Sequence, residues 1–140
     1  MNILLVEDNY HASKIQNSFI NSVYNLERAK TIREAVRSLE SGKPYQAAIV
    51  DLDLDREYLF AHLSEEIMEA EAEQYGGWVF YRHILRNYPP LDKNTIILSA
   101  LIRQFIDYTD SEQYEGMYLI NKSDMNCESK VFKALHSLIS

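Results

Sequence analysis

The stretch AAIVDLD, residues 47–53, decides the fold of this 140-residue chain. Four consecutive apolar residues are followed at once by the carboxylate of Asp51. Such a run is typical of a strand in a parallel sheet, because helices bury both faces of such a sheet. Ligands of open α/β sheets bind just outside the carboxyl ends of the strands. We therefore expect Asp51 to project from the edge of the sheet into a functional crevice.

A second apolar run, residues 2–6, also ends in acidic residues, Glu7 and Asp8. Parallel strands bring their carboxyl ends to the same edge of a sheet, so these carboxylates are expected to lie near Asp51. Carboxylate oxygens are the ligands that Mg²⁺ prefers. The two runs together predict a magnesium site at this edge.

The rest of the chain alternates between short apolar runs and amphipathic segments. This alternation predicts a doubly wound α/β domain with a mainly parallel sheet. Thr31 and Glu34 have the spacing of a capping box, which marks the start of a helix. The expected strands cover residues 2–6, 24–29, 46–51, 95–99 and 117–121, and the expected helices cover 10–22, 31–41, a segment from about 76, and 127–139.

One segment, about residues 54–75, is longer than a simple loop between a strand and a helix. Leu59, Leu63 and Ile67 recur every four residues, and glutamates occupy many of the positions between and after them. The pattern predicts an acidic amphipathic helix over about 56–75. Two interpretations remain open: the helix covers its own apolar stripe, or it forms a partner surface, a dimer surface or a lid over the site.

Length and composition indicate one domain, residues 1–140, with an ordinary share of apolar and charged residues. The formal net charge of −7 and the lack of a basic stripe argue against binding to nucleic acid or to a membrane surface. Cys127 is the only cysteine, so no intramolecular disulfide forms. No signal peptide or membrane-spanning run is recognisable, and we expect a cytoplasmic protein.

These strand-end residues resemble those of the receiver domains of two-component response regulators. Residues 1–9 look like the opening strand of that family with its acidic pair, and residues 45–51 look like the strand that carries its phospho-accepting aspartate. Ser99-Ala100 and Lys122 stand where the family has Ser or Thr followed by Ala, and its lysine. The resemblance implies a flavodoxin-like (βα)5 three-layer sandwich with a five-stranded parallel sheet, here carrying an extra acidic helical insertion at about 54–75.

The resemblance implies a metal site for Mg²⁺. Asp8 and Asp51 would be ligands, Glu7 would act largely through a metal-bound water, and the backbone carbonyl of Asp53 would be a further ligand. A carboxylate can attack a phosphoryl group and hold it as an acyl phosphate. Asp51 is thus the expected phospho-acceptor.

The same resemblance assigns roles to two further side chains. Lys122 would pair with Asp51 and then with a phosphoryl oxygen. The hydroxyl group of Ser99 would bind another phosphoryl oxygen and swing inward when the phosphoryl group arrives.

The resemblance also implies partners. A histidine kinase or a histidine phosphotransfer protein would donate the phosphoryl group, and phosphorylation would change the face formed by the last two strands and their helices. The output would be a downstream protein target or an output domain missing from these residues, and a homodimer is a further possibility. Such a domain is not an enzyme in the ordinary sense, because it catalyses only its own phosphorylation and dephosphorylation.

The sequence departs from the family pattern at several positions. Ser123 follows Lys122 where the family usually has proline, so we expect a trans bond there and a different direction for Lys122. Leu119 stands where an aromatic residue is common, and the neighbouring Tyr118 should point to the other face of the sheet. Asp53 adds a carboxylate two residues after the acceptor.

Two alternative functions stay open. The first is a pseudo-receiver that keeps the fold and binds proteins without being phosphorylated. The second is a phosphatase of the haloacid-dehalogenase type, because Asp51 and Asp53 have the spacing of its nucleophile and general acid. That reading leaves Glu7 and Asp8 without a role.

Overall fold

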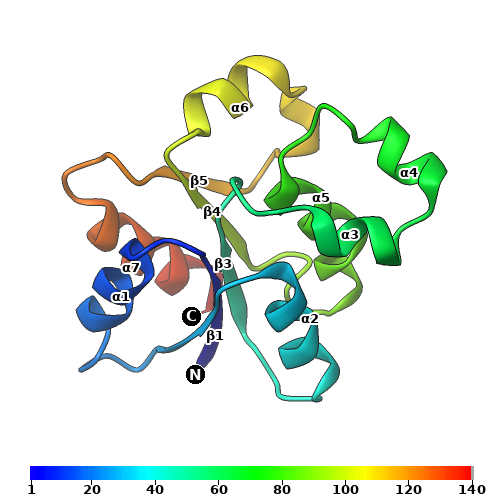
Figure 1. Ribbon diagram of the computed structural model, residues 1–140. Coiled ribbons are helices and arrows are strands. Elements are labelled where there is room, and N and C mark those ends of the chain that lie inside the picture. Colours follow the sequence, from blue (N-terminus) through cyan, green and yellow to red (C-terminus); the bar gives the residue numbers. More distant parts are fainter. Residues whose placement is uncertain (140) are drawn as a thin grey trace.

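Five parallel strands form the sheet at the centre of the structure, a computed structural model that describes residues 1–139 and their side chains except that of His11. The strand order is β2-β1-β3-β4-β5 (Figure 1). This is a common order of doubly wound sheets, and the predicted flavodoxin-like class is confirmed. The strands are β1 (Asn2–Val6), β2 (Asn25–Ala29), β3 (Ala47–Val50), β4 (Thr95–Ser99) and β5 (Tyr118–Asn121).

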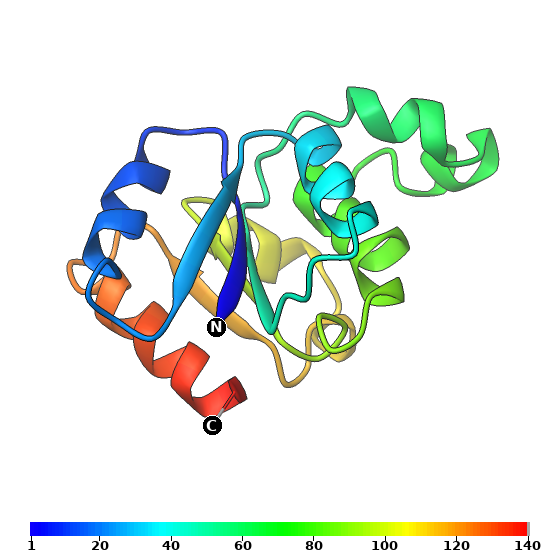
Figure 2. The ribbon, with the colours of Figure 1, turned by 90° about the horizontal axis from the view of Figure 1, so that it is seen from below.

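Helices cover both faces of the sheet and make a three-layer sandwich. In Figures 1 and 2, α1 and α7 lie on one side of the sheet, and α2 and α5 lie on the other. The α-helices are α1 (His11–Ser18), α2 (Ile32–Glu40), α3 (Glu57–His62), α4 (Glu65–Ala70), α5 (Gly76–His83), α6 (Ile102–Tyr108) and α7 (Cys127–Ile139). Two short 3₁₀ helices follow α5 and α6, at η1 (Leu85–Asn87) and η2 (Ser111–Gln113).

Alternate residues of each strand enter different halves of the core. Ile3 and Leu5 of β1 pack with the cluster that includes α1 and α7, and Leu4 and Val6 pack with the cluster that includes α2 and α5. A strand that is buried on both faces needs apolar residues at every position. This explains why the strands read as continuous apolar runs in the sequence.

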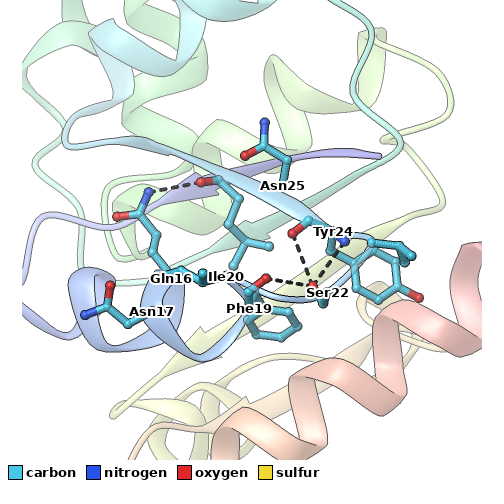
Figure 3. A pocket seen from close by; sticks show the side chains of 9 residues that line it. Gln16, Asn17, Phe19, Ile20, Ser22, Tyr24 and Asn25 are labelled. Atoms are coloured by element: carbon cyan, nitrogen blue, oxygen red, sulfur yellow. Dashed lines mark hydrogen bonds between the residues drawn. The ribbon is translucent and has the colours of Figure 1, made fainter.

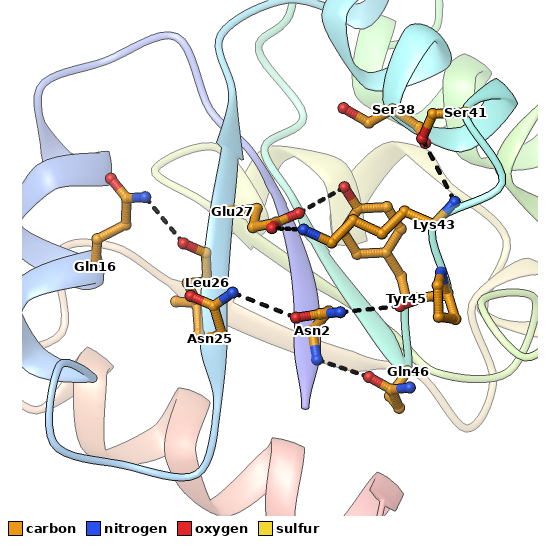
Figure 4. Close-up of polar contacts among 11 residues, drawn as sticks. Asn2, Gln16, Asn25, Leu26, Glu27, Ser38, Ser41, Lys43, Tyr45 and Gln46 are labelled. Carbon is orange, nitrogen blue, oxygen red and sulfur yellow. Dashed lines mark hydrogen bonds and ion pairs between the residues drawn. The ribbon is translucent and has the colours of Figure 1, made fainter.

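Polar side chains tie the strands together at the amino end of the sheet (Figure 4). The side chain of Asn2 accepts a hydrogen bond from the Asn25 side chain at 3.3 Å, and the Asn2 amide donates one to the side chain of Gln46 at 2.7 Å. The hydroxyl group of Tyr45 donates to Glu27, which also pairs with Lys43. These contacts join β1, β2 and the start of β3 at the end opposite the predicted site.

The first two helices test the sequence predictions in detail. Helix α2 begins as predicted: the hydroxyl group of Thr31 accepts from the amide of Glu34 at 3.1 Å, and the Glu34 carboxylate accepts from the amide of Lys30. Helix α1, however, ends at Ser18 instead of continuing to residue 22. Ile20 therefore lies beyond the helix and is 70% exposed, so the predicted range of this helix, 10–22, is too long.

The segment between β3 and α5 is helical, as predicted, but it is not one helix. Helix α3 ends at His62 and α4 begins at Glu65, because Ser64 caps a new helix by accepting from the amide of Ile67 at 3.2 Å. Helix α3 packs against α2, where the guanidinium of Arg33 lies 5.7 Å from the centre of the Tyr58 ring. Helix α4 projects outward at the right of Figure 1, away from the end of β3.

Arg56 closes this segment at its base. One guanidinium nitrogen donates to the backbone carbonyl oxygens of Glu71, Ala72 and Gln74, at 2.9, 3.2 and 3.1 Å. The two ends of the α3–α4 segment are thereby held together by a single side chain.

The Arg56→Ala variant is expected to loosen the α3–α4 segment without unfolding the sheet. Three carbonyl groups lose a charged donor, which costs roughly 1–3 kcal/mol. Hydrogen exchange measured by mass spectrometry should become faster in residues 57–75 and stay unchanged in the strands. The matched control is Arg103→Ala, since Arg103 is exposed. Equal protection of residues 57–75 in both variants would show that Arg56 does not hold the segment.

Candidate functional site at the carboxyl edge of the sheet

Glu7, Asp8 and Asp51 meet where β1 and β3 end. Val6 lies opposite Val50 in the register of the two strands, so the next residues leave the sheet side by side. The amide of Asp51 donates to the carbonyl of Val6 at 3.1 Å. One carboxylate oxygen from each acid lies within 4.8 Å of the others. The donor set consists of oxygen atoms alone, which fits the predicted magnesium ion.

Lys122 lies between two of these carboxylates. Its ammonium nitrogen is 2.8 Å from Asp51 Oδ2 and 2.5 Å from Glu7 Oε2. All three side chains are at least nine-tenths buried. Within residues 1–139 the only cis peptide bond is Pro89–Pro90, so the bond to Ser123 is trans as predicted. The accompanying expectation that Lys122 points elsewhere is wrong, because the turn still directs it to Asp51.

The two buried carboxyl groups differ in their affinity for protons. Burial, aided by the negative charge of Asp51, raises the pKa of Glu7 to about 7, although the hydrogen bond from Lys122 opposes this. Burial also raises the pKa of Asp51, but the hydrogen bond and charge of Lys122 outweigh burial and leave it below its usual value. The two carboxylates in turn raise the pKa of Lys122, against the effect of burial. Asp51 is therefore ionised at neutral pH.

Ser99 lies at the end of β4 and is fully buried. Its hydroxyl oxygen accepts from the amide of Leu101 at 3.2 Å, and a hydrogen bond from this hydroxyl group also helps to lower the pKa of Asp51. The carbonyl of Ser99 accepts from the amide of Lys122 at 3.2 Å, which fixes the start of the loop after β5. The structure thus brings Ser99 and Lys122 to the same edge as the acids.

Asp53 has its side chain exposed, while its amide donates to Asp51 Oδ1 at 3.2 Å. The role of its carbonyl as a metal ligand stays a prediction. Leu119 is partly buried in the cluster with α2 and α5, and Tyr118 is 38% exposed.

Gly77 is a residue of the site that our sequence analysis did not identify. A Cβ atom at this position would lie 1.8 Å from the carbonyl oxygen of Asp51, so only glycine allows this approach. The amide of Gly77 also donates to the carbonyl of Leu52 at 3.0 Å. The signal in the sequence is the pair Gly76-Gly77, because two adjacent glycines have a low helix propensity and yet begin a helical segment.

Arg28 was also missed. It donates to the backbone carbonyl groups of Glu7 and Asn9 at 3.1 and 3.0 Å, and so fixes the loop that carries Asp8. No pattern in the sequence links this arginine of β2 to that loop.

A separate cavity of about 430 Å³ lies near the end of α1 (Figure 3). None of its lining residues is charged; they include Gln16, Asn17, Phe19, Tyr24 and Asn25. It therefore offers no charged side chain to a cation or a phosphoryl group.

The pKa of Glu7 predicts how stability depends on pH. The folded state holds a proton on Glu7 up to about pH 7, whereas the unfolded chain releases it near 4.5. The stabilisation from this proton is complete below pH 4.5 and is lost as the pH rises to about 7. In urea unfolding without divalent cations, the free energy of unfolding of the wild type relative to Glu7→Gln should fall by more than about 1 kcal/mol between pH 5 and pH 7.

The comparison with Glu7→Gln cancels the titration of the groups that do not interact with Glu7. Asp51 and Lys122 titrate outside this pH range, since the pKa of Asp51 is lowered and that of Lys122 is raised. A constant difference from pH 5 to pH 7 would contradict the raised pKa of Glu7.

Known structures share this arrangement of strands and helices. A sensor protein from Polaromonas sp. superposes with a TM-score of 0.69 at 18% identity, covering 99% of this chain and 94% of that one. The receiver domain of a Francisella response regulator gives 0.62 at 19% identity, covering 99% and 95%. A response regulator from Thermotoga maritima, solved in complex with Mg²⁺ and BeF, gives 0.60 at 18% identity, covering 96% and 98%.

No protein-family model and no curated relative matches the chain. None of the helices in residues 1–139 has the length and apolar character required to cross a bilayer. At these low identities the likeness concerns the fold. The strand order, the layers and the similar structures lead to one conclusion: this chain has the fold of the receiver domains of response regulators.

Proposed function

We propose that the chain is a phospho-accepting receiver domain in which Asp51 receives a phosphoryl group from a partner histidine kinase or histidine phosphotransfer protein. The observation that carries this proposal is the geometry of Asp51, whose carboxylate is held by Lys122 at 2.8 Å beside the carboxylates of Glu7 and Asp8. Phosphoryl transfer needs a nucleophile, a positive charge that can pair with the transferred phosphoryl oxygens, and a set of oxygen ligands for a metal ion.

In this proposal an oxygen of Asp51 forms a bond to phosphorus while the bond from phosphorus to the donor's imidazole nitrogen breaks. The electron pair of that bond stays on the imidazole. Mg²⁺, held by Glu7, Asp8, Asp51 and the carbonyl of Asp53, would offset the negative charge of the phosphoryl oxygens.

The remaining residues position the transferred group. Lys122 exchanges its contact with Asp51 for one with a phosphoryl oxygen, and the hydroxyl group of Ser99 binds another. Movement of these two side chains alters the ends of β4 and β5, and so changes the binding of a downstream target, an output domain or a second copy. Exposed apolar side chains, including Tyr108 and Tyr118, lie on α6 and β5 and are available for such contacts. We expect this signalling in the cytoplasm.

A pseudo-receiver is the second candidate, and one observation favours it. Lys122 contacts both Asp51 and Glu7, so its ammonium group already offsets part of the negative charge that a magnesium ion would otherwise offset. In addition, Leu119 stands at the position where the family often uses an aromatic residue in its switch. A phosphatase of the haloacid-dehalogenase type is less favoured, because it gives no role to the close approach of Glu7 and Asp8 to Asp51.

Intact-mass spectrometry after incubation with acetyl phosphate and Mg²⁺ tests the proposal. The wild type should gain the mass of one phosphoryl group and lose it again on standing, because acyl phosphates hydrolyse. Asp51→Asn should gain nothing, and Asp8→Asn should be phosphorylated at least about tenfold more slowly through loss of a metal ligand. The matched control is Asp53→Asn, which removes a neighbouring exposed carboxylate but keeps the backbone carbonyl.

Phosphorylation of Asp51→Asn at the wild-type rate would mean that another residue is the acceptor. A folded wild type that gains no phosphoryl group would favour the pseudo-receiver.

A further inference from the structure

The acidic character of the chain is concentrated in one segment. Residues 54–75 contain seven acidic side chains and one arginine, whereas the rest of the chain has 14 acidic and 13 basic side chains. Almost all of the net charge of −7 thus belongs to α3, α4 and their flanks. One of these acids, Glu71, is buried and paired with Arg82 at 2.8 Å, so it does not contribute to the outer surface.

An apolar groove lies within this acidic segment. It has a volume of about 540 Å³ and is lined by Arg56, Phe60, Glu65, Met68, Glu69 and Ala72. The last four follow one another at helical spacings of three, one and three residues, so they share one side of α4 and its end. Phe60 of α3 also lines the groove. The volume is in the range of sites that bind ligands or anchor side chains.

The groove is lined by both apolar and acidic side chains. Phe60 is 60% exposed, whereas Met68 is buried. Glu65 and Glu69 are exposed, and within residues 1–139 neither of them is part of an ion pair. An exposed aromatic beside unpaired carboxylates favours an occupant that is apolar on one side and positively charged on the other.

Arg56 does not supply the positive charge that would pair with Glu65 and Glu69. Its guanidinium group is bound to the carbonyl oxygens of Glu71, Ala72 and Gln74, and lies 5.7 Å from the centre of the Phe60 ring. These hydrogen bonds hold the start of α3 near the segment that follows α4. A groove that is held open in advance loses less entropy when a partner binds.

We propose that the groove between α3 and α4 is a docking site for a basic amphipathic helix of a partner protein. An apolar side chain of that helix inserts between Phe60 and Met68, and its Lys or Arg side chains pair with Glu65 and Glu69. Nucleic acid and anionic membranes are unsuitable occupants, because their phosphates would be repelled by the carboxylates. The site is distinct from Asp51, so the proposal holds whether or not the chain is phosphorylated.

Fluorescence anisotropy with a panel of labelled helical peptides tests this proposal. Each peptide has lysine and arginine on one side and a Leu, Phe or Trp anchor on the other, and each has a counterpart in which glutamate replaces the basic residues. Basic peptides should bind saturably and acidic ones should not. Phe60→Ala should weaken binding at least about tenfold, as is typical for loss of an aromatic anchor.

Two double variants separate the groove from general attraction by the acidic segment. Glu65→Lys with Glu69→Lys reverses both carboxylates of the groove, and Glu66→Lys with Glu73→Lys makes the same change in charge outside it. The first should weaken binding at least about tenfold, and the second by no more than about threefold. Circular dichroism and thermal unfolding establish that all variants are folded.

Three results would overturn the proposal. The first is saturable binding by none of the basic peptides. The second is equal loss of binding in the two double variants, which would indicate nonspecific charge attraction. The third is self-association of the wild type, measured by analytical ultracentrifugation, that Phe60→Ala abolishes, because a second copy would then be the occupant.

Discussion

The contact of the Lys122 ammonium group with the carboxylates of Asp51 and Glu7 is the interaction on which the arrangement of the site depends. Two carboxylates buried at adjacent strand ends repel each other and lose their hydration. One ammonium group between them offsets both effects only if β5 ends at the level of β1 and β3. Removing one partner of such a buried pair generally lowers the free energy of unfolding by about 3–5 kcal/mol. The ends of β1, β3 and β5 must therefore stay aligned for the charges to remain paired.

Glu7 and Asp51, the two carboxyl groups that contact Lys122, differ in their affinity for protons, and this difference suits the proposed phosphoryl transfer. Glu7 keeps a proton up to about pH 7, whereas Asp51 is ionised. The residue expected to attack phosphorus is thus the one that carries the negative charge. Lys122 lowers the pKa of both groups. The pKa of Asp51 is lowered further by hydrogen bonds from the amide of Asp53 and the hydroxyl group of Ser99, whereas the charge of Asp51 raises the pKa of Glu7.

The backbone packs closely around the carbonyl of Asp51, and this packing limits the path of the α3–α4 segment. The chain leaves β3, passes outward through α3 and α4, and returns at Gly77 to touch the carbonyl of Asp51. Arg56 closes this excursion by binding the carbonyl groups near its far end. An acidic, partly apolar surface is thereby attached to the site by a short connection, while α4 itself stands away from the sheet.

Much of the fold could be predicted from the sequence, because its signals are local. The apolar runs of the strands, the capping by Thr31 and the burial of Ile32, Ala35, Val36 and Leu39 all follow from spacing along the chain. Polar residues follow four of the apolar runs, and this pattern predicts that their side chains meet, because the carboxyl ends of parallel strands lie at the same edge of the sheet. The break between α3 and α4 is also local, but the single cap at Ser64 is a weaker signal than the regular spacing of apolar residues on either side of it.

Other features were decided only by tertiary structure. The contact of Arg56 with three distant carbonyl groups, the approach of Gly77 to Asp51 and the direction of Lys122 each join residues that are far apart in the chain. The sequence by itself determined which residues form strands and which end them, because periodicity and turn chemistry act over a few residues. Tertiary structure decided which charges are buried together, because desolvation and ion pairing depend on neighbours that only folding supplies.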